Sequence, residues 1–108
     1  MTEQEINFLL VSDPVVQKYN RRYLDHDYAT DVIAFNMDEK GVLGDILIST
    51  DTARRQAKEQ GHSLFQEVII LAIHGVLHLI GYRDKKKLES RKMWKKTDEL
   101  LSLVEGIR

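Results

Sequence analysis

The sequence contains no cysteine, which excludes disulfide bonds and thiolate metal ligands and is consistent with a reducing compartment. No apolar run approaches the roughly 20 residues that a membrane-spanning helix needs. The N-terminal stretch MTEQEINFLLVSD also lacks the basic start and long apolar segment of a secretory signal. We therefore expect a cytoplasmic protein that does not associate with a membrane.

An excess of either charge is also missing. The 16 Lys and Arg residues nearly balance the 17 Asp and Glu residues, so the net charge of −1 indicates no class of partner. The distribution is less even, because the segment 83–96, RDKKKLESRKMWKK, holds eight of the basic residues. A composition of 43% hydrophobic and 31% charged residues over 108 positions is typical of one globular domain, residues 1–108.

Apolar patterning predicts an α+β fold with about three strands and four helices. The strands are expected over residues 6–12, 31–37 and 42–50, and the helices over 13–23, 52–60, 64–80 and 86–104. The segment 64–80 is apolar nearly all round, which is typical of a buried central helix. A three-stranded sheet is thin, so we expect it to build its core against that helix.

Polar residues and glycines mark the expected helix ends. Asp51 or Thr52 is predicted to cap the second helix, and Gly61 to end it. Ser63 with Gln66 resembles a capping box that opens the central helix, and Gly81 is predicted to end that helix. The inner face of the last helix is expected to carry five apolar residues: Leu88, Trp94, Leu100, Leu101 and Val104.

The stretch HGVLHLIGYRD, residues 74–84, has the spacing of a metal site. His74 and His78 are one helical turn apart, so their imidazoles share a face and suit one metal ion. Gly81 can turn the chain back, which gives Asp84 a route to the same ion. Three protein ligands with an open fourth position are typical of a catalytic zinc. The alternative from spacing alone is that the two histidines are core or interface residues.

A zinc peptidase has similar spacing, H-E-x-x-H-x-x-G-x-x-H, but needs its glutamate as a general base. Gly75 stands at that position, and Asp84 stands where the third histidine would be. A small zinc peptidase is therefore the less favoured interpretation.

Three motifs resemble those of the YbeY-type endoribonucleases, the bacterial rRNA maturation factors. HGVLHLIGYRD resembles the signature H-G-x-L-H-L-x-G-Y-D-H. Upstream, NRRYLDHDYATDVIAF at 20–35 resembles N-x-x-y-R-x-x-D-x-x-T-D-V-L-S-F, and LGDILIS at 43–49 resembles L-G-D-I-x-I-S. The resemblance runs from about residue 6 to 100, with the motifs in the family's order.

The resemblance implies a metal-dependent hydrolase, with zinc as the usual ion, that cleaves single-stranded RNA. It also implies processing of rRNA ends of the ribosomal small subunit and a role in ribosome quality control. Metal ligation falls to His74, His78 and Asp84, with one zinc ion per chain; manganese or another divalent ion is an alternative, because Asp84 adds an oxygen ligand. The oligomeric state is left open.

The sequence departs from the family pattern at several positions. Asp84 replaces the third histidine, and Arg83 replaces the aspartate before it. Leu24 stands where the family has an arginine, and Ala29 where it has a proline. Family members usually begin with an additional strand and helix, so the sheet edge of this chain is expected to differ.

Further site residues follow from charge and position. A cationic side chain is expected to stabilise the transition-state phosphate, and Arg21 or Arg22 is the candidate in place of Leu24. Thr30 and Asp31 are expected at a strand entrance near the metal, with turn capping as the alternative role. The start of the basic segment adjoins the metal site and is predicted to bind RNA through four residues: Arg83, Lys85, Lys86 and Lys87. A non-catalytic RNA- or ribosome-binding homologue remains the rival interpretation, supported by Leu24 and Asp84.

Overall fold

The computed structural model describes residues 4–24, 30–39 and 41–106. Its elements, in chain order, are β1 (Glu5–Val11), α1 (Asp13–Leu24), β2 (Val32–Glu39), β3 (Val42–Ser49), α2 (Thr50–Gln60), α3 (Leu64–Leu79) and α4 (Lys87–Gly106). The α+β fold, with a three-stranded sheet on a central helix that carries both histidines, is thus confirmed. Within the described residues no single helix is long and apolar enough to cross a membrane; α2 and α3 reach that length and composition only as a pair, bent by 114°.

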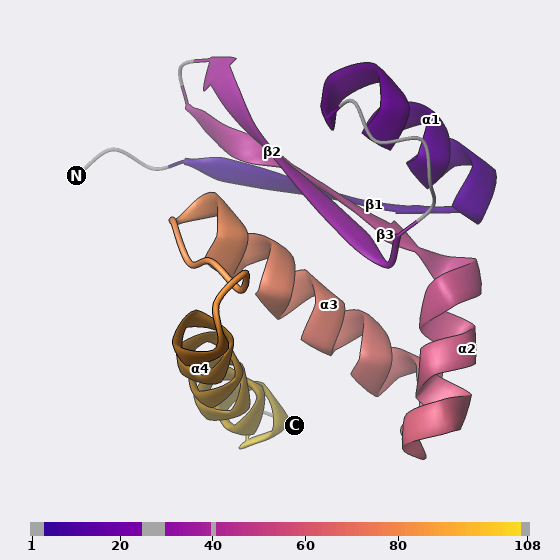
Figure 1. Cartoon of the computed structure of the whole chain (residues 1–108), viewed down its shortest axis with the longest axis vertical. Coiled ribbons are helices and arrows are strands. Elements are labelled where there is room, and N and C mark those ends of the chain that lie inside the picture. The colour runs from indigo at the N-terminus through magenta and orange to yellow at the C-terminus, as the bar shows by residue number, and fades with distance from the viewer. Residues whose placement is uncertain (1–3, 25–29, 40, 107–108) are drawn as a thin grey trace.

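The sheet has the order β1-β3-β2, with β3 parallel to β1 and antiparallel to β2. Figure 1 shows α1 on one face of the sheet and α3 on the other, with α4 beyond α3. The central strand is buried on both faces, and its side chains alternate between them. Ile46 and Ile48 pack with Leu71 of α3, whereas Leu47 packs with Val16 of α1. The core therefore has two parts, one on each face of the sheet, and α3 packs directly against the central strand.

The helix boundaries follow local capping chemistry, with one departure from expectation. Both halves of the capping box of Ser63 and Gln66 are present at the start of α3, and Gly61 ends α2 in a left-handed conformation, with φ of 73°. The prediction of Asp51 or Thr52 as the cap of α2 is wrong. Ser49 is the cap, and its hydroxyl accepts a hydrogen bond from the Thr52 backbone at 3.1 Å. Since β3 runs directly into α2, the last strand residue occupies the capping position.

Asp13 ties the start of α1 to the junction of β3 and α2. Its carboxylate accepts hydrogen bonds from the hydroxyls of Ser49 and Thr52, the latter at 2.7 Å, and from the Arg55 guanidinium at 3.1 Å. The hydrogen bond from Ser49, followed by that from Thr52, lowers the pKa of the Asp13 carboxyl below its usual 3.8. The ionised form is thus the one that the folded chain stabilises.

We expect Asp13→Asn to lower the free energy of unfolding by about 1–3 kcal/mol at neutral pH, because the hydroxyls and Arg55 lose a charged acceptor. A folded-state pKa below 3.8 gives a contribution that is present above that pH and is lost as the pH falls through the lower folded value. Urea unfolding of both proteins at neutral and acidic pH measures the difference. Equal stability at neutral pH would contradict this role, and Asp98→Asn on the exposed side of α4 is the control.

The inner face of α4 differs from the expected one. Met93 and Thr97 are buried, and the Thr97 hydroxyl donates to the Met93 carbonyl at 2.8 Å. Three residues that were expected inside are exposed: Leu88 at 62%, Trp94 at 51% and Val104 at 37%. Because its hydroxyl bonds to the backbone of its own helix, Thr97 can be buried without an outside partner, and with Met93 it forms part of the inward face.

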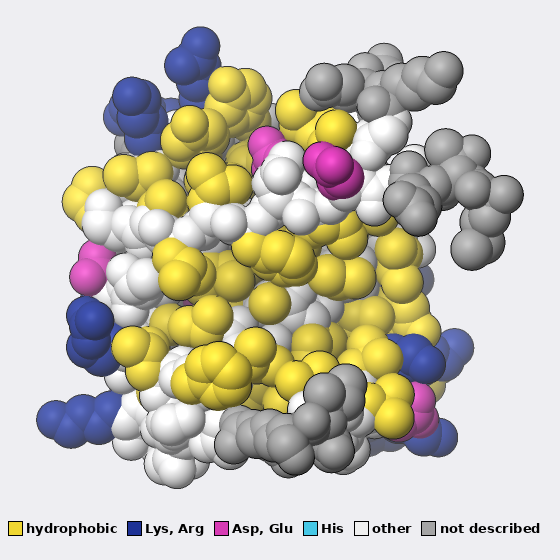
Figure 2. Space-filling view, turned by 180° about the vertical axis from the view of Figure 1, so that it is seen from behind, with side chains coloured by type: hydrophobic (Ala, Val, Ile, Leu, Met, Phe, Trp, Pro, Cys, Tyr) yellow, Lys and Arg dark blue, Asp and Glu magenta, His cyan; other side chains and the backbone are white. Residues whose placement is uncertain are grey.

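The strand β1 lies at the edge of the sheet and carries exposed apolar side chains, Phe8, Leu9 and Leu10. Figure 2 shows apolar side chains gathered on the face seen from behind. An apolar groove of about 340 Å³ is lined by residues of β1, α3 and α4: Phe8, Ile69, Ala72, Ile73, Val76, Leu100, Leu103 and Val104. The groove lies outside the polar cavities described below.

Candidate active site

The C-terminus of α3 is closed by a turn that returns the chain toward the helix. The Gly81 amide donates to the His78 carbonyl at 3.1 Å, and the Tyr82 amide donates to the Leu77 carbonyl at 2.9 Å. This is a Schellman motif, and it requires the left-handed conformation that Gly81 adopts, with φ of 106°. The turn places the Tyr82 carbonyl beside the side chain of His78.

His78 is held by this carbonyl. Its Nδ1 lies 3.1 Å from the Tyr82 oxygen, and because a carbonyl only accepts, Nδ1 is the nitrogen that donates. The lone pair is thereby left on Nε2, which lies 3.7 Å from Oδ2 of Asp84. Fixing the tautomer through the second ring nitrogen is the usual arrangement for a histidine that binds metal.

His74, one turn earlier, has a buried Nε2 with no hydrogen-bond partner among the described residues. Its ring stands nearly perpendicular to the Trp94 indole, at 82°, with the ring centroids 4.7 Å apart. Burial lowers the pKa of the His74 imidazole, and the Asp31 carboxylate opposes this. A neutral ring with an unused buried nitrogen costs about 1–3 kcal/mol unless a ligand meets it.

These features fit a divalent metal ion, although the ligands are not assembled around one point. Within the described ranges no three His, Asp or Glu side chains are placed to hold an ion together. On neighbouring turns of α3 each histidine has an Nε2 without a hydrogen-bond partner among the described residues, and the Asp84 side chain is more than half exposed beside His78. Two imidazoles and one carboxylate form a common zinc donor set.

Asp31 and Thr30 lie where β2 begins, close to His74. Oδ1 of Asp31 accepts from the Val32 amide at 2.8 Å and from the Thr30 hydroxyl at 3.4 Å, while Oδ2 accepts from Gln56 at 3.3 Å. Asp31 also lines a cavity with His74. Asp31 therefore both caps the turn before β2 and lies near His74. Thr30 is linked to the site only by its hydrogen bond to Asp31.

The predicted cationic residues fall into two groups. Arg21 and Arg22 lie in the last turn of α1, on the face of the sheet opposite α3, so the structure does not bring them to the histidines (Figure 1). Arg83 and Lys85, in contrast, line a hollow of about 380 Å³ with His78, Tyr82 and Asp84. Lys86 and Lys87 are exposed next to this hollow but do not line it.

Comparison with known proteins identifies the family. The family model described as "Endoribonuclease YbeY" matches residues 1–105. The chain belongs to the YbeY endoribonuclease family.

The chain is similar in sequence to proteins named endoribonuclease YbeY. The one from Bacillus licheniformis is 41% identical over 111 residues, covering 91% of this chain and 70% of that protein. The one from Carboxydothermus hydrogenoformans is 44% identical over 102 residues, covering 92% and 71%. The solution structure of TM1509 from Thermotoga maritima has a TM-score of 0.68 at 28% identity, covering 96% of this chain and 70% of that one. This YbeY chain thus spans about 70% of the length of these relatives.

Gly75 in this YbeY chain faces the sheet and not the histidines' side of α3. A Cβ at this position would lie 2.6 Å from Cγ2 of Ile46, so even alanine would force the core to move. The glutamate of a zinc peptidase has no room at this position. The packing of α3 on β3 therefore argues against the peptidase interpretation.

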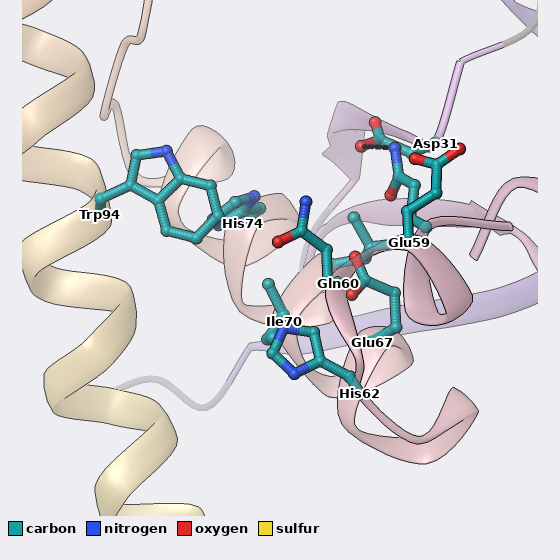
Figure 3. A pocket seen from close by; sticks show the side chains of 10 residues that line it. Asp31, Glu59, Gln60, His62, Glu67, Ile70, His74 and Trp94 are labelled. Carbon is teal, nitrogen blue, oxygen red and sulfur yellow. Dashed lines mark hydrogen bonds between the residues drawn. The ribbon is translucent and has the colours of Figure 1, made fainter. Parts of the chain in front are cut away.

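Sequence reasoning did not identify several residues around His74. A cavity of about 330 Å³ is lined by Asp31, Gln56, Glu59, Gln60, His62, Glu67, Ile70, Leu71, His74 and Trp94. Figure 3 shows Trp94 and His74 at one end of it, and Asp31 and Glu59 at the other. Glu67 had a detectable signal: it is seven residues before His74, hence on the same helix face, and is a lone carboxyl in an apolar run. Asp27, which matches the YbeY motif, and Ala29, where the family has a proline, lie outside the described residues.

Proposed function

We propose that this chain is a metal-dependent endoribonuclease that cuts single-stranded RNA and acts on rRNA of the ribosomal small subunit, in rRNA maturation and ribosome quality control. Membership of the YbeY family supports RNA cleavage, since the relatives are named endoribonucleases. The observation that carries the metal dependence is the pair of imidazoles, one with an orphaned buried Nε2 and the other with its tautomer fixed by Tyr82.

His74, His78 and Asp84 would hold the ion, which we propose to be zinc, or manganese if oxygen ligation dominates. When bound, such an ion supplies Lewis-acid activation of water and of a phosphoryl oxygen. The Tyr82 carbonyl keeps the His78 ring oriented, and the Trp94 indole packs on the His74 ring and limits its exposure to water.

The hollow beside His78 supplies the phosphate contacts. Arg83 and Lys85 line it, so a phosphodiester that approaches His78 meets two cations. These contacts are independent of base identity and position the strand. Lys86 and Lys87 extend the positive charge along the exposed turn, where they can contact neighbouring phosphates.

Cleavage of end-labelled single-stranded RNA tests the proposal. We expect slow cleavage that a chelator abolishes, that added Zn²⁺ or Mn²⁺ restores, and that His78→Ala lacks. Duplex RNA of the same sequence and casein should remain intact. Chelator-sensitive proteolysis without RNA cleavage would contradict the proposal.

A non-catalytic RNA-binding homologue is the second candidate, and two observations favour it. The three ligands are not assembled around one point, and Arg21 and Arg22 lie on the far face of the sheet. RNA binding with stoichiometric metal but no cleavage in the same assay would support this candidate.

A further inference from the structure

The cavity that His74 lines differs in chemistry from the hollow beside His78, where Arg83 and Lys85 would contact phosphate. Three carboxylates line it, from Asp31, Glu59 and Glu67, and no lysine or arginine does among the residues that the structure describes. Such a lining repels phosphate and accepts hydrogen bonds from N–H groups. Its volume, about 330 Å³, lies at the lower end of the range for small-molecule pockets, about 300–1,000 Å³. The cavity therefore suits a small, uncharged group that is rich in N–H donors.

Glu67 is the residue that marks the cavity as a binding site. The residue as a whole is only 6% exposed, and its carboxyl forms no hydrogen bond to another group of the described residues. Burial raises the pKa of this carboxyl, whereas the nearby His62 lowers it. The carboxyl oxygens of Glu67 are not among the fully buried polar atoms without a partner, so they remain open to the cavity that Glu67 lines. A ligand with N–H donors in this cavity can therefore use their free acceptor capacity.

The remaining lining supplies the other contacts that a planar base needs. The half-exposed indole of Trp94 offers an aromatic surface at one end of the cavity (Figure 3). Unpaired RNA bases commonly stack on aromatic side chains and hydrogen-bond through their Watson–Crick edges. The amide of Gln60 and the imidazole of His62 can donate to ring and carbonyl acceptors.

We propose that this cavity binds an unpaired guanine of the RNA substrate, with Glu67 accepting hydrogen bonds from guanine N1–H and N2–H₂. Only guanine presents two adjacent N–H donors on its Watson–Crick edge, which matches the two oxygens of one carboxylate. Adenine and cytosine pair a donor with an acceptor there, and uracil has a single ring N–H. The inference rests on the proposed function, because it places this base beside the phosphodiester that would be cut at the ion held by His74 and His78.

Trp94 makes the binding step measurable without catalysis, because it is the only tryptophan in the chain. We would titrate the chelator-treated protein with the four ribonucleoside 5′-monophosphates and follow tryptophan fluorescence. The shared phosphate makes any difference a property of the base. We expect saturable quenching with about tenfold tighter binding of GMP than of the other three, the discrimination typical of one bidentate base contact.

Glu67→Gln should remove the guanine preference while leaving quenching by the other nucleotides unchanged. Glu99→Gln, on the exposed side of α4, is the matched control and should keep the preference. Equal affinity for all four nucleotides in the parent protein would overturn the inference, and this measurement needs no variant. A guanine preference that survives in Glu67→Gln would also overturn it.

The outcome separates the two proposals. RNA cleavage with no base discrimination in the titration would leave the nuclease function intact and remove the guanine site. A Glu67-dependent guanine preference in a protein that does not cut RNA would support the site and contradict the catalytic function.

Discussion

Replacing His74 by alanine should reduce the metal content of the purified protein from about one ion per chain to near zero. The buried Nε2 of His74 lacks a partner among the described residues, and the His78 Nε2 offers its lone pair one turn away. Without His74, His78 and an exposed carboxylate are left, and two ligands do not hold zinc through purification. Elemental analysis of protein purified without added metal measures the change.

His62→Ala is the control for this experiment, because His62 is an exposed histidine that is not among the proposed ligands. His78→Ala should behave as His74→Ala does. Since His74 also packs on Trp94, circular dichroism must show that each variant is folded, and His74→Gln offers a less disruptive replacement. Full zinc content in a folded His74→Ala protein would show that the site is assigned to the wrong residues.

Most of the fold was predictable because the apolar pattern of each segment agrees with the way that the segment packs in the structure. Short apolar runs bounded by polar residues marked the strands, and an almost wholly apolar segment marked α3 as the central helix. The cap of α2 was not predictable in this way. Asp51, Thr52 and Ser49 are all good capping residues, and the choice depended on β3 running into α2 without a loop.

The site was predictable only where its residues are close in sequence. The spacing of His74, His78 and Gly81 fixes one helix end, and the structure shows the turn that this spacing requires. The approach of Trp94 to His74 depends on how α4 crosses α3, which no local pattern specifies. For the same reason the position of Arg21 and Arg22 on the far face became visible only with the layer order of the fold.

The role of Asp84 was also not predictable from the sequence alone, because it depends on the path of the chain after Gly81. The sequence allowed it to ligate metal, to cap the turn, or to pair with Arg83 or a lysine. In the described part of the chain Oδ2 of Asp84 lies 3.7 Å from Nε2 of His78, and Asp84 forms no ion pair with Arg83 or the neighbouring lysines. A divalent ion near this pair would meet an imidazole and a carboxylate together, which supports the ligand role.

We therefore expect Asp84→Ala to weaken metal affinity by orders of magnitude and Asp84→His to restore it, since carboxylate and imidazole bind zinc at similar distances of about 2.0–2.2 Å. The replacement should also change the choice of ion. An oxygen ligand favours harder ions such as Mn²⁺, so Asp84→His should shift the competition toward Zn²⁺. Competition titrations with a chromogenic chelator measure both effects, with Asp98→Ala on α4 as the control. Zinc binding by Asp84→Ala as tight as that of the parent would show that Asp84 is not a ligand, and a two-histidine site would then favour the non-catalytic homologue.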